Sequence, residues 1–196
     1  MITDLAEFLD LAWTHLVRGV KDRKHGFHQP VLATVQDGKP RARTVVLRKV
    51  DREQGLILCH TDRRSGKIGQ SPGGVEWCFY DRKSRLQVRA AAAAEVLTEG
   101  PVFEERWNAS RLASRRCYLA PHVPGSEVAE AHPNLPDHLR DRDPTQEESE
   151  AGRDNFAVFL TRVERLDVLH LAHDGHSRAA WTLDPAGPSQ GVWVAP

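Results

Sequence analysis

The stretch RARTVVLRKVDREQGLILCHTDRRSGK, residues 41–67, decides the fold and carries most of the chemistry. Two apolar runs, at residues 44–47 and 56–59, flank a polar turn at residues 51–55. Short apolar and β-branched runs separated by turn residues are typical of a β-hairpin. We therefore expect a hairpin here, with an anion site at the end where the second run leads into HTDRRSGK, residues 60–67.

Positive charge is concentrated in the same stretch. Residues 39–67 contain nine Lys and Arg against three acids, although the whole chain has 27 of each and a formal net charge of zero. Phosphate is bound by guanidinium forks, ammonium groups and short hydroxyls. The stretch predicts a site for a phosphate-bearing ligand, and the alternative is a solvated basic edge strand that resists aggregation. All three kinds of donor are present in Arg43, Arg48, Thr61, Ser65 and Lys67.

Arg43 and Arg48 raise a geometric difficulty if residues 41–50 form one regular strand. They are five positions apart, so their side chains would point to opposite faces of the sheet. Both could serve one ligand only if the strand bulges or if the ligand lies across a subunit boundary. Thr61 and Ser65 are placed better, because a short helix predicted at residues 65–70 would offer N–H groups to an anion.

Length and composition limit the class of protein. A chain of 196 residues is expected to form a single domain, residues 1–196, with a sizeable core. Zero net charge and a pI of about 7.2 argue against a nucleic-acid partner, and no apolar run approaches the length of a membrane span. Three widely spaced cysteines without a CxxC motif indicate buried or half-buried thiols in a reducing cytoplasm. No metal is expected, because no Cys/His quartet has zinc spacing.

Hydrophobic periodicity predicts a mainly β chain with flanking helices. Apolar residues at helical spacing over residues 5–20 predict an amphipathic helix, and residues 102–119 predict two helical pieces broken near Asn108. Six to eight strands joined by short turns predict an antiparallel barrel with helices outside it. The expected strands are residues 30–35, 41–50, 55–60, 75–80, 85–97, 156–160, 166–171, 179–183 and possible last strand 192–194.

Residues 121–150 differ from the rest of the chain. They contain eight acids against two arginines, several prolines and few large apolar side chains. A loop of this length within a compact domain is either a lid or a disordered insert. We expect a mobile acidic insert over residues 121–153.

The order of short motifs along the chain resembles the pyridoxamine 5′-phosphate oxidase family over about residues 27–183. This resemblance implies an antiparallel split β-barrel of the FMN-binding type, FMN as the cofactor, and a homodimer with the cofactor site at its interface. It also implies oxidoreductase chemistry on a small-molecule substrate. The motifs are RTVVLR (residues 43–48), HTDRRSGK (60–67), LQVR (86–89), WNASR (107–111), DNF (154–156) and HSR (176–178).

The resemblance also implies roles for individual residues. Ser65 and Lys67, with Thr61, would bind the FMN phosphate, and Gln87 would hydrogen-bond the flavin ring. The implied cofactor set is Arg43, Thr44, Val45, Val46, Leu47, Arg48, His60, Thr61, Ser65, Lys67, Gln87 and Arg178. The implied substrate set is Arg48, Trp107, Arg111 and His176.

Three departures from the family pattern bear on activity. Gly66 stands where the family has a phosphate-binding arginine, and Leu169 stands where a tryptophan is often found. Asp174 replaces the arginine of the family's arginine-x-histidine pair, and an acid there would repel a substrate phosphate. The sequence therefore supports FMN binding better than it supports turnover of pyridoxamine phosphate.

Two functions follow as hypotheses. The first is an FMN-dependent oxidoreductase of unknown substrate, with no catalytic residue assigned, in which a hydride passes between the substrate and the flavin. The alternative is a non-catalytic module that binds or senses flavin, haem or deazaflavin.

Overall fold

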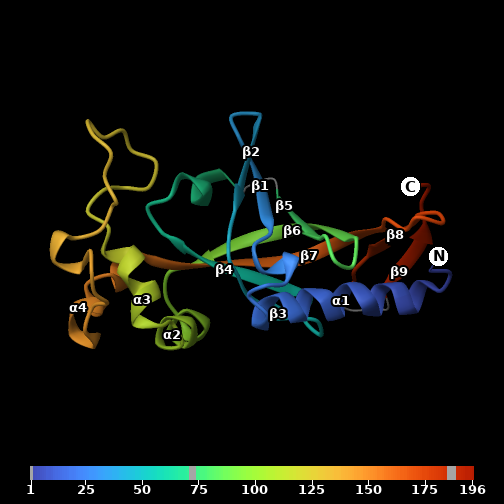
Figure 1. Cartoon of the computed structure of the whole chain (residues 1–196), viewed down its shortest axis with the longest axis horizontal. Coiled ribbons are helices and arrows are strands. Elements are labelled where there is room, and N and C mark those ends of the chain that lie inside the picture. The colour runs from blue at the N-terminus through green and yellow to red at the C-terminus, as the bar shows by residue number, and fades with distance from the viewer. Residues whose placement is uncertain (1, 71–73, 185–188) are drawn as a thin grey trace. The chain divides into compact units, whose positions relative to one another are not determined.

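This computed structural model describes residues 2–70, 74–184 and 189–196, and nine strands form one sheet in this part of the chain (Figure 1). Their order is β2-β1-β5-β6-β7-β4-β3, with β8 beside β7 and β9 beside β8. The prediction of a mainly β, antiparallel fold is confirmed, with one strand more than the six to eight expected. The strands are β1 (Val31–Gln36), β2 (Lys39–Thr44), β3 (Leu47–Asp51), β4 (Leu56–Asp62), β5 (Val75–Asp81), β6 (Leu86–Leu97), β7 (Phe156–His170), β8 (Ser177–Thr182) and β9 (Gln190–Trp193).

The stretch that was expected to be one strand at residues 41–50 is two strands. β2 ends at Thr44 and pairs with β1, whereas β3 begins at Leu47 and pairs with β4. Between them, the Val45 N–H donates to the Pro30 carbonyl at 3.0 Å. β2 and β3 are therefore consecutive in the chain but lie at the two ends of the strand order, so the sheet stays open between them.

This break removes the difficulty with the two arginines, because Arg43 and Arg48 belong to different strands. The β3–β4 hairpin over the opening stretch is confirmed, with an irregular register between Leu47 and Lys49. In contrast, the strands expected at residues 156–160 and 166–171 are not separate, because residues 156–170 form the single 15-residue β7. The intervening Thr161 and Val163 are buried and Arg162 is exposed, so the two-residue alternation of a strand continues through them.

The N-terminal helix follows its sequence signals closely. α1 (Leu5–Lys21) begins after Asp4, whose carboxylate accepts from the Glu7 N–H at 2.8 Å. Its buried stripe includes Phe8, Trp13 and Leu16. The β1–β2 turn is also as expected, because Asp37 and Gly38 both have positive φ, 51° and 72°, as in the tight turns that suit β-hairpins.

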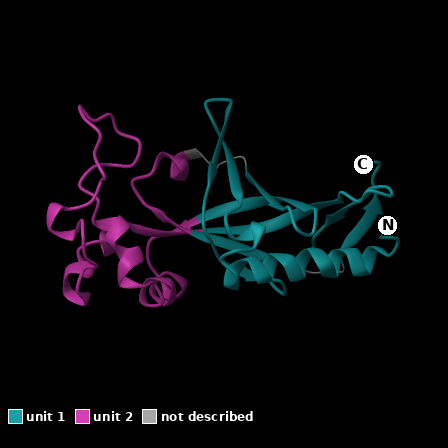
Figure 2. Ribbon diagram, in the orientation of Figure 1, with its two compact units in different colours: residues 1–59, 70–95, 160–196 teal, residues 60–69, 96–159 magenta. Residues whose placement is uncertain are grey.

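The chain divides into two compact units (Figure 2). Unit 1 contains residues 1–59, 70–95 and 160–196, and unit 2 contains residues 60–69 and 96–159. Unit 1 has a buried polar bridge, in which Trp77 Nε1 donates to Thr161 Oγ1 at 3.0 Å and Thr161 Oγ1 donates to the Ile57 carbonyl at 2.7 Å. Whether residues 1–196 behave as a single domain stays a prediction.

Unit 2 contains the short helices and the acidic segment. The two expected helical pieces are present as α2 (Pro101–Asn108) and α3 (Leu112–Arg115). Within the acidic segment, α4 (Gln146–Glu150) begins with a capping box between Thr145 and Glu148. The mobility expected for residues 121–153 stays a prediction. The 3₁₀ helices of the chain are η1 (Gly26–His28), η2 (Gly66–Gln70), η3 (Arg116–Leu119), η4 (Asp137–Leu139) and η5 (Arg153–Asn155).

The three cysteines are free thiols, as expected, but they differ in exposure. Cys59 is buried and Cys78 is half-buried, whereas Cys117 is exposed, so the expectation of buried or half-buried thiols is wrong for Cys117. Among the helices of residues 2–70, 74–184 and 189–196, none has the length and apolar character that a membrane crossing requires.

Gly26→Ala is expected to destabilise the protein by about 2 kcal/mol, as overpacking typically does. A Cβ at this position would lie 2.4 Å from the Tyr80 carbonyl oxygen and 2.6 Å from Asp81 Cα, both backbone atoms that cannot swing aside. Gly69→Ala is the matched control, because nothing lies within 4 Å of its Cβ position. Urea unfolding measures both, and equal stability of the two variants would contradict the tight packing at Gly26.

Candidate functional site

A lysine and two hydroxyls converge where β4 leads into η2, in unit 2. Lys67 Nζ donates to Thr61 Oγ1 and to Ser65 Oγ, each at 2.8 Å. Thr61 is buried, whereas Ser65 and Lys67 are half-buried. We call Thr61, Ser65 and Lys67 the hydroxyl–lysine cluster. It unites an ammonium group with two short hydroxyls, which is a donor set suited to a phosphate.

The loop that carries the cluster is fixed by its own charged residues. Asp62 receives the Arg64 guanidinium in a two-pronged contact, Nε to Oδ1 at 3.0 Å and Nη2 to Oδ2 at 2.7 Å. These hydrogen bonds raise the pKa of Arg64, which also donates to the Ala120 carbonyl at 3.1 Å. Because Arg64 is neutralised by Asp62, the positive charge that faces the hydroxyls comes from Lys67.

The DNF motif supports the same loop. The Arg63 N–H donates to the Asn155 carbonyl at 2.8 Å, and the Arg63 side chain reaches the Asp154 carbonyl at 3.2 Å. Phe156 packs edge-on against the His60 ring, with ring centroids 4.9 Å apart. The motif therefore positions the backbone on either side of Thr61.

The cofactor residues predicted on β2 lie in unit 1. Arg43 donates from Nη1 to Thr34 Oγ1 at 2.7 Å and to the Leu32 carbonyl at 3.3 Å, which directs its side chain back over β1. Burial lowers the pKa of Arg43, and the neighbouring Arg41 lowers it further. Thr44 ends the same strand and pairs with Val31 of β1.

The other cofactor residues predicted in this stretch lie at and after the break. Val45 and Val46 form the connection between β2 and β3, and both are half-buried. Leu47 is buried at the start of β3, where it pairs with Cys59 of β4. Arg48 follows it on β3 and is half-buried.

The last predicted cofactor residues lie on β6 and β8 of unit 1. Gln87 is a half-buried residue of β6 that pairs with Tyr80 of β5. Arg178 of β8 forms a two-pronged contact with Asp167, Nε to Oδ1 at 3.0 Å and Nη2 to Oδ2 at 2.8 Å. The hydrogen bonds that Arg178 donates to Asp167 raise the pKa of Arg178, so this arginine is already engaged by a carboxylate.

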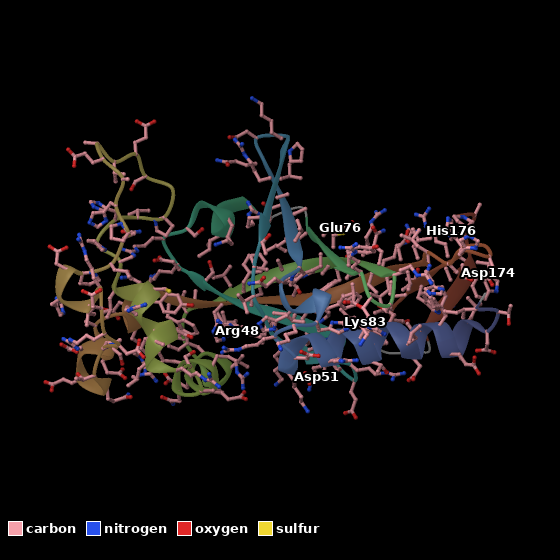
Figure 3. All side chains as sticks on the ribbon, viewed as in Figure 1. Arg48, Asp51, Glu76, Lys83, Asp174 and His176 are labelled. Atoms are coloured by element: carbon pink, nitrogen blue, oxygen red, sulfur yellow. The ribbon has the colours of Figure 1, made fainter. Side chains whose placement is uncertain are left out.

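The predicted substrate residues of unit 1 are not brought together. Arg48 and His176 lie at opposite ends of unit 1 along the horizontal axis of Figure 3, and a separation seen in projection is a lower limit on the true one. His176 and Asp174 are exposed. His176 and Arg178 line a cavity of about 350 Å³ whose other walls include Ile2 and Trp193.

The predicted substrate residues of unit 2 differ from each other. Arg111 is exposed at the start of α3. Trp107 has no exposed surface, its Nε1 donates to Glu150 Oε2 at 3.2 Å, and the Arg115 guanidinium lies 4.2 Å from its ring centroid. These contacts give Trp107 a packing role in unit 2, and its contact with substrate stays a prediction.

Sequence reasoning missed two features of the site. It counted Arg64 among the positive charges of the stretch, although Asp62, two positions earlier, pairs with it. It also gave no role to Asn155, whose side chain donates to the Tyr118 carbonyl at 2.8 Å while its own carbonyl holds Arg63. The Asp-x-Arg spacing could have indicated the Asp62–Arg64 pair. No local sequence signal indicates the contacts of Asn155.

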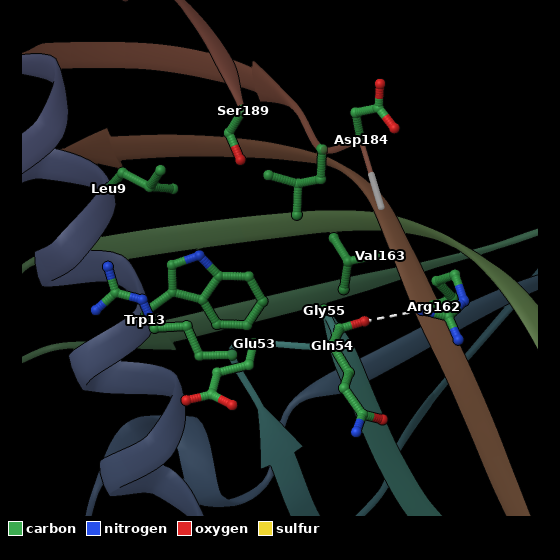
Figure 4. Close-up of a pocket in the computed structure, with 11 residues that line it drawn as sticks. Leu9, Trp13, Glu53, Gln54, Gly55, Arg162, Val163, Asp184 and Ser189 are labelled. Atoms are coloured by element: carbon green, nitrogen blue, oxygen red, sulfur yellow. Dashed lines mark hydrogen bonds between the residues drawn. The ribbon is translucent and has the colours of Figure 1, made fainter. Parts of the chain in front are cut away.

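A cavity of about 500 Å³ lies elsewhere in unit 1, between α1, the β3–β4 turn and β7 (Figure 4). Trp13 and Leu9 form one wall, and Arg162 donates to the Gln54 carbonyl at 2.9 Å on another. Its described lining contains none of the residues predicted to bind FMN. Size alone therefore does not identify the candidate site, and the donor chemistry of the hydroxyl–lysine cluster does.

Comparison with known sequences gives a family likeness. Residues 10–98 match the family model described as pyridoxamine 5′-phosphate oxidase, FMN-binding domain. Pyridoxine/pyridoxamine 5′-phosphate oxidase 2 of Arabidopsis thaliana is 27% identical over 199 residues, which cover 90% of this chain and 96% of the relative. The family resemblance read from the motifs is thereby confirmed.

Comparison with solved structures identifies the fold. A pyridoxamine 5′-phosphate oxidase-related, FMN binding protein from Nostoc punctiforme has a TM-score of 0.69 at 22% identity, covering 100% of both chains. PhzG from Burkholderia lata, solved with tetrahydrophenazine-1-carboxylic acid, has a TM-score of 0.63 at 16% identity, covering 98% of this chain and 90% of PhzG. These likenesses confirm the split-barrel fold that the sequence predicts.

Proposed function

We propose that the chain, which resembles the pyridoxamine 5′-phosphate oxidase-like, FMN-binding split-barrel proteins, is a flavoprotein that binds FMN and oxidises or reduces a small molecule. The observation that carries this function is the hydroxyl–lysine cluster, in which Lys67 Nζ lies 2.8 Å from both Thr61 Oγ1 and Ser65 Oγ. The remaining cofactor contacts are assigned by family resemblance.

The residues of the cluster fit the phosphate of FMN. Two hydroxyls and an ammonium group can each donate to a separate phosphate oxygen, at the hydrogen-bond distances they now use for one another. Gly66 removes the arginine that the family pattern would add, so Lys67 has a larger share of the phosphate binding in this chain. Bound FMN would supply the redox chemistry, exchanging a hydride with the substrate.

Family resemblance adds further residues to the proposed cofactor set. They are Arg43, residues 44–48, His60, Gln87 and Arg178. The Arg43 guanidinium is held by its hydrogen bond to Thr34 of β1. Any flavin that Arg178 contacts would have to share the Arg178 guanidinium with Asp167. Arg48 and His176 are separated within one chain (Figure 3), which favours a homodimer in which a second copy supplies part of the substrate site. Three free thiols favour a cytoplasmic location.

An absorption spectrum of the purified protein tests the cofactor directly. We expect a yellow protein whose chromophore is released by denaturation and identified as FMN by mass. A haem or deazaflavin spectrum would replace FMN with another cofactor, and a protein that stays colourless after incubation with FMN would contradict the function.

A second function is favoured by Asp174, an exposed acid where the family has an arginine beside His176. Without that arginine the protein would bind or sense flavin and catalyse little. Peroxide release from pyridoxamine 5′-phosphate distinguishes the two functions, and robust turnover would remove the non-catalytic one.

Asp174→Arg is expected to lower the KM for pyridoxamine 5′-phosphate by about tenfold, equivalent to about 1.4 kcal/mol, because it exchanges repulsion of the phosphate for attraction. Asp184→Arg is the matched control, since it makes the same charge change at a residue that lines the separate 500 Å³ cavity. Peroxide assays at varied substrate concentration measure both. Equal effects of the two variants would show that only net charge matters.

A further inference from the structure

Two histidines and an aspartate meet in unit 1, on elements that carry none of the predicted cofactor or substrate residues. His15 lies on α1, His25 caps η1, and Asp81 ends β5. Their candidate ligand atoms lie within 4.8 Å of one another, and His15 Nδ1 is 3.0 Å from His25 Nε2. They line a cavity of about 510 Å³ with Arg18, Asp22, Lys24, Lys83 and Ser84.

Two glycines set the distance between the histidines. A Cβ on Gly19 of α1 would lie 2.8 Å from Phe27 Cβ, and a Cβ on Gly26 would lie 2.4 Å from the Tyr80 carbonyl oxygen. α1, η1 and the end of β5 are therefore packed backbone against backbone, with no side chain between them. This packing fixes the separation of the two imidazoles, independently of any bond between them.

The hydrogen bonds allow only one arrangement of protons on the neutral pair. His25 Nδ1 accepts from the Phe27 N–H at 3.1 Å, so the proton of the neutral His25 ring is on Nε2. That Nε2–H must then donate to His15 Nδ1, which leaves the proton of His15 on its own Nε2. The Phe27 N–H, the His25 ring and the His15 ring therefore form a chain of hydrogen bonds in which each group donates to the next.

The same bonds argue against a metal ion at these three residues. A metal on His25 Nε2 would require the ring proton on Nδ1, where it would face the Phe27 N–H. Asp81 is also engaged, since Oδ1 accepts from the Gly26 N–H at 3.1 Å and Oδ2 accepts from the Ser84 N–H and hydroxyl at 2.8 Å each. The trio is built for hydrogen bonding within the protein.

We propose that His15 and His25 form an acid-sensitive latch, which joins α1 to η1 while both rings are neutral and opens when either ring is protonated. A proton added to His15 Nδ1 would face the His25 Nε2–H, and a proton added to His25 Nδ1 would face the Phe27 N–H. Either event turns a hydrogen bond into a contact between two donors. At acidic pH the latch would thus no longer hydrogen-bond α1 to η1.

The environment of the pair sets the pH at which the latch opens. Burial lowers the pKa of both His15 and His25, and Arg18 lowers both further, whereas Asp81 raises both. Asp22 raises the pKa of His25, and Lys24 and Lys83 line the same cavity. Burial by itself would raise the pKa of Asp81, but its bonds from Ser84 and Gly26 lower it to about 2, so this acid stays charged throughout.

The sign of the pH dependence follows from these directions. The unfolded histidines take up protons near pH 6.5, whereas the folded ones do so only at lower pH. The unfolded state therefore binds more protons, and the folded state loses stability as pH falls below about 7. Each histidine that stays neutral contributes up to about a tenfold change in the unfolding constant per pH unit.

Urea unfolding between pH 5 and 8 tests the latch. His15→Gln and His25→Asn should each reduce the pH slope by up to about one proton, and the asparagine keeps a cap for the Phe27 N–H. His28→Gln is the matched control, because His28 contacts the Gly19 carbonyl and not the pair. Slopes unchanged by the first two substitutions, or reduced as much by the control, would overturn the proposal.

Imidazole ¹⁵N NMR of the unsubstituted protein near pH 7.5 gives a second test that needs no variant to fold. We expect His25 to carry its proton on Nε2 and His15 to have an unprotonated Nδ1. A His25 proton on Nδ1 would overturn the latch. So would added Zn²⁺ that stabilises the unsubstituted protein but not His15→Gln, because it would show that the pair binds metal.

Discussion

Lys67→Ala is expected to weaken FMN binding by about 30- to 100-fold. Lys67 Nζ holds Thr61 Oγ1 and Ser65 Oγ at 2.8 Å each, and a phosphate bound there would have this ammonium group as its charge partner. Hydrogen bonds to charged groups contribute about 1.5–3 kcal/mol, and each 1.4 kcal/mol corresponds to tenfold in affinity. Titration of apoprotein with FMN, followed by flavin fluorescence, measures the change.

The controls separate local binding from net charge. Lys83→Ala removes the same charge from the β5–β6 turn of unit 1 and should bind FMN as the unsubstituted protein does. Adding Arg43→Ala to Lys67→Ala should abolish retention of FMN through purification. An affinity of Lys67→Ala within about threefold of the unsubstituted protein would show that the hydroxyl–lysine cluster does not hold the phosphate.

Arg115→Ala is expected to destabilise the protein by about 3 kcal/mol, because a buried polar group left without its partner costs about 1–3 kcal/mol and Arg115 serves two such groups. Arg115 is 2% exposed, and its Nη1 donates to Glu150 Oε1 at 2.8 Å and to Ser149 Oγ at 3.1 Å. Its Nη2 donates to the Trp107 carbonyl at 2.9 Å. One side chain thus joins α4 to α2, and its loss leaves two buried acceptors, Ser149 Oγ and the Trp107 carbonyl, without this donor.

Thermal unfolding measures this loss, with an expected fall in Tm of about 6–12 °C for a chain of this length. Arg111→Ala is the matched control, because Arg111 is exposed in the same region and should change stability by less than about 0.5 kcal/mol. Hydrogen exchange should also increase over residues 146–150 in Arg115→Ala. Equal Tm values for the two variants would show that Arg115 does not anchor α4.

Much of the fold could be predicted because local signals agreed with tertiary packing. The apolar stripe and the Asp4 cap predict α1, and the Asp37-Gly38 turn has the positive φ angles that its residue types favour. The alanines at residues 90–94 have a strong helical propensity, yet they belong to β6. The alternating flanks predict this correctly, since pairing with β5 outweighs propensity.

The break at residues 45–46 could not be predicted for a physical reason. Val45 and Val46 are strong strand formers, and no Gly or Pro marks the place where the chain leaves β1 and crosses to β4. The crossing is decided by which strands are available to pair. Residues far apart in sequence set that choice, and a single sequence does not reveal it.

The candidate site was predictable in its chemistry but not in all its contacts. Residue type alone identified Thr61, Ser65 and Lys67 as donors that suit a phosphate. The packing role of Trp107 could have been predicted from its spacing. Phe103 and Trp107 are four positions apart, so they share one helix face, and both are buried. The His15–His25 pair had none, since no spacing motif links α1, η1 and β5.

Comparison of FMN with riboflavin tests the central claim most directly, because the two ligands differ only in the phosphate. Titration of the apoprotein with each ligand should show riboflavin binding at least about 30-fold more weakly than FMN, and Lys67→Ala should remove most of that difference. Equal affinity of the apoprotein for the two ligands would contradict a phosphate site at Thr61, Ser65 and Lys67.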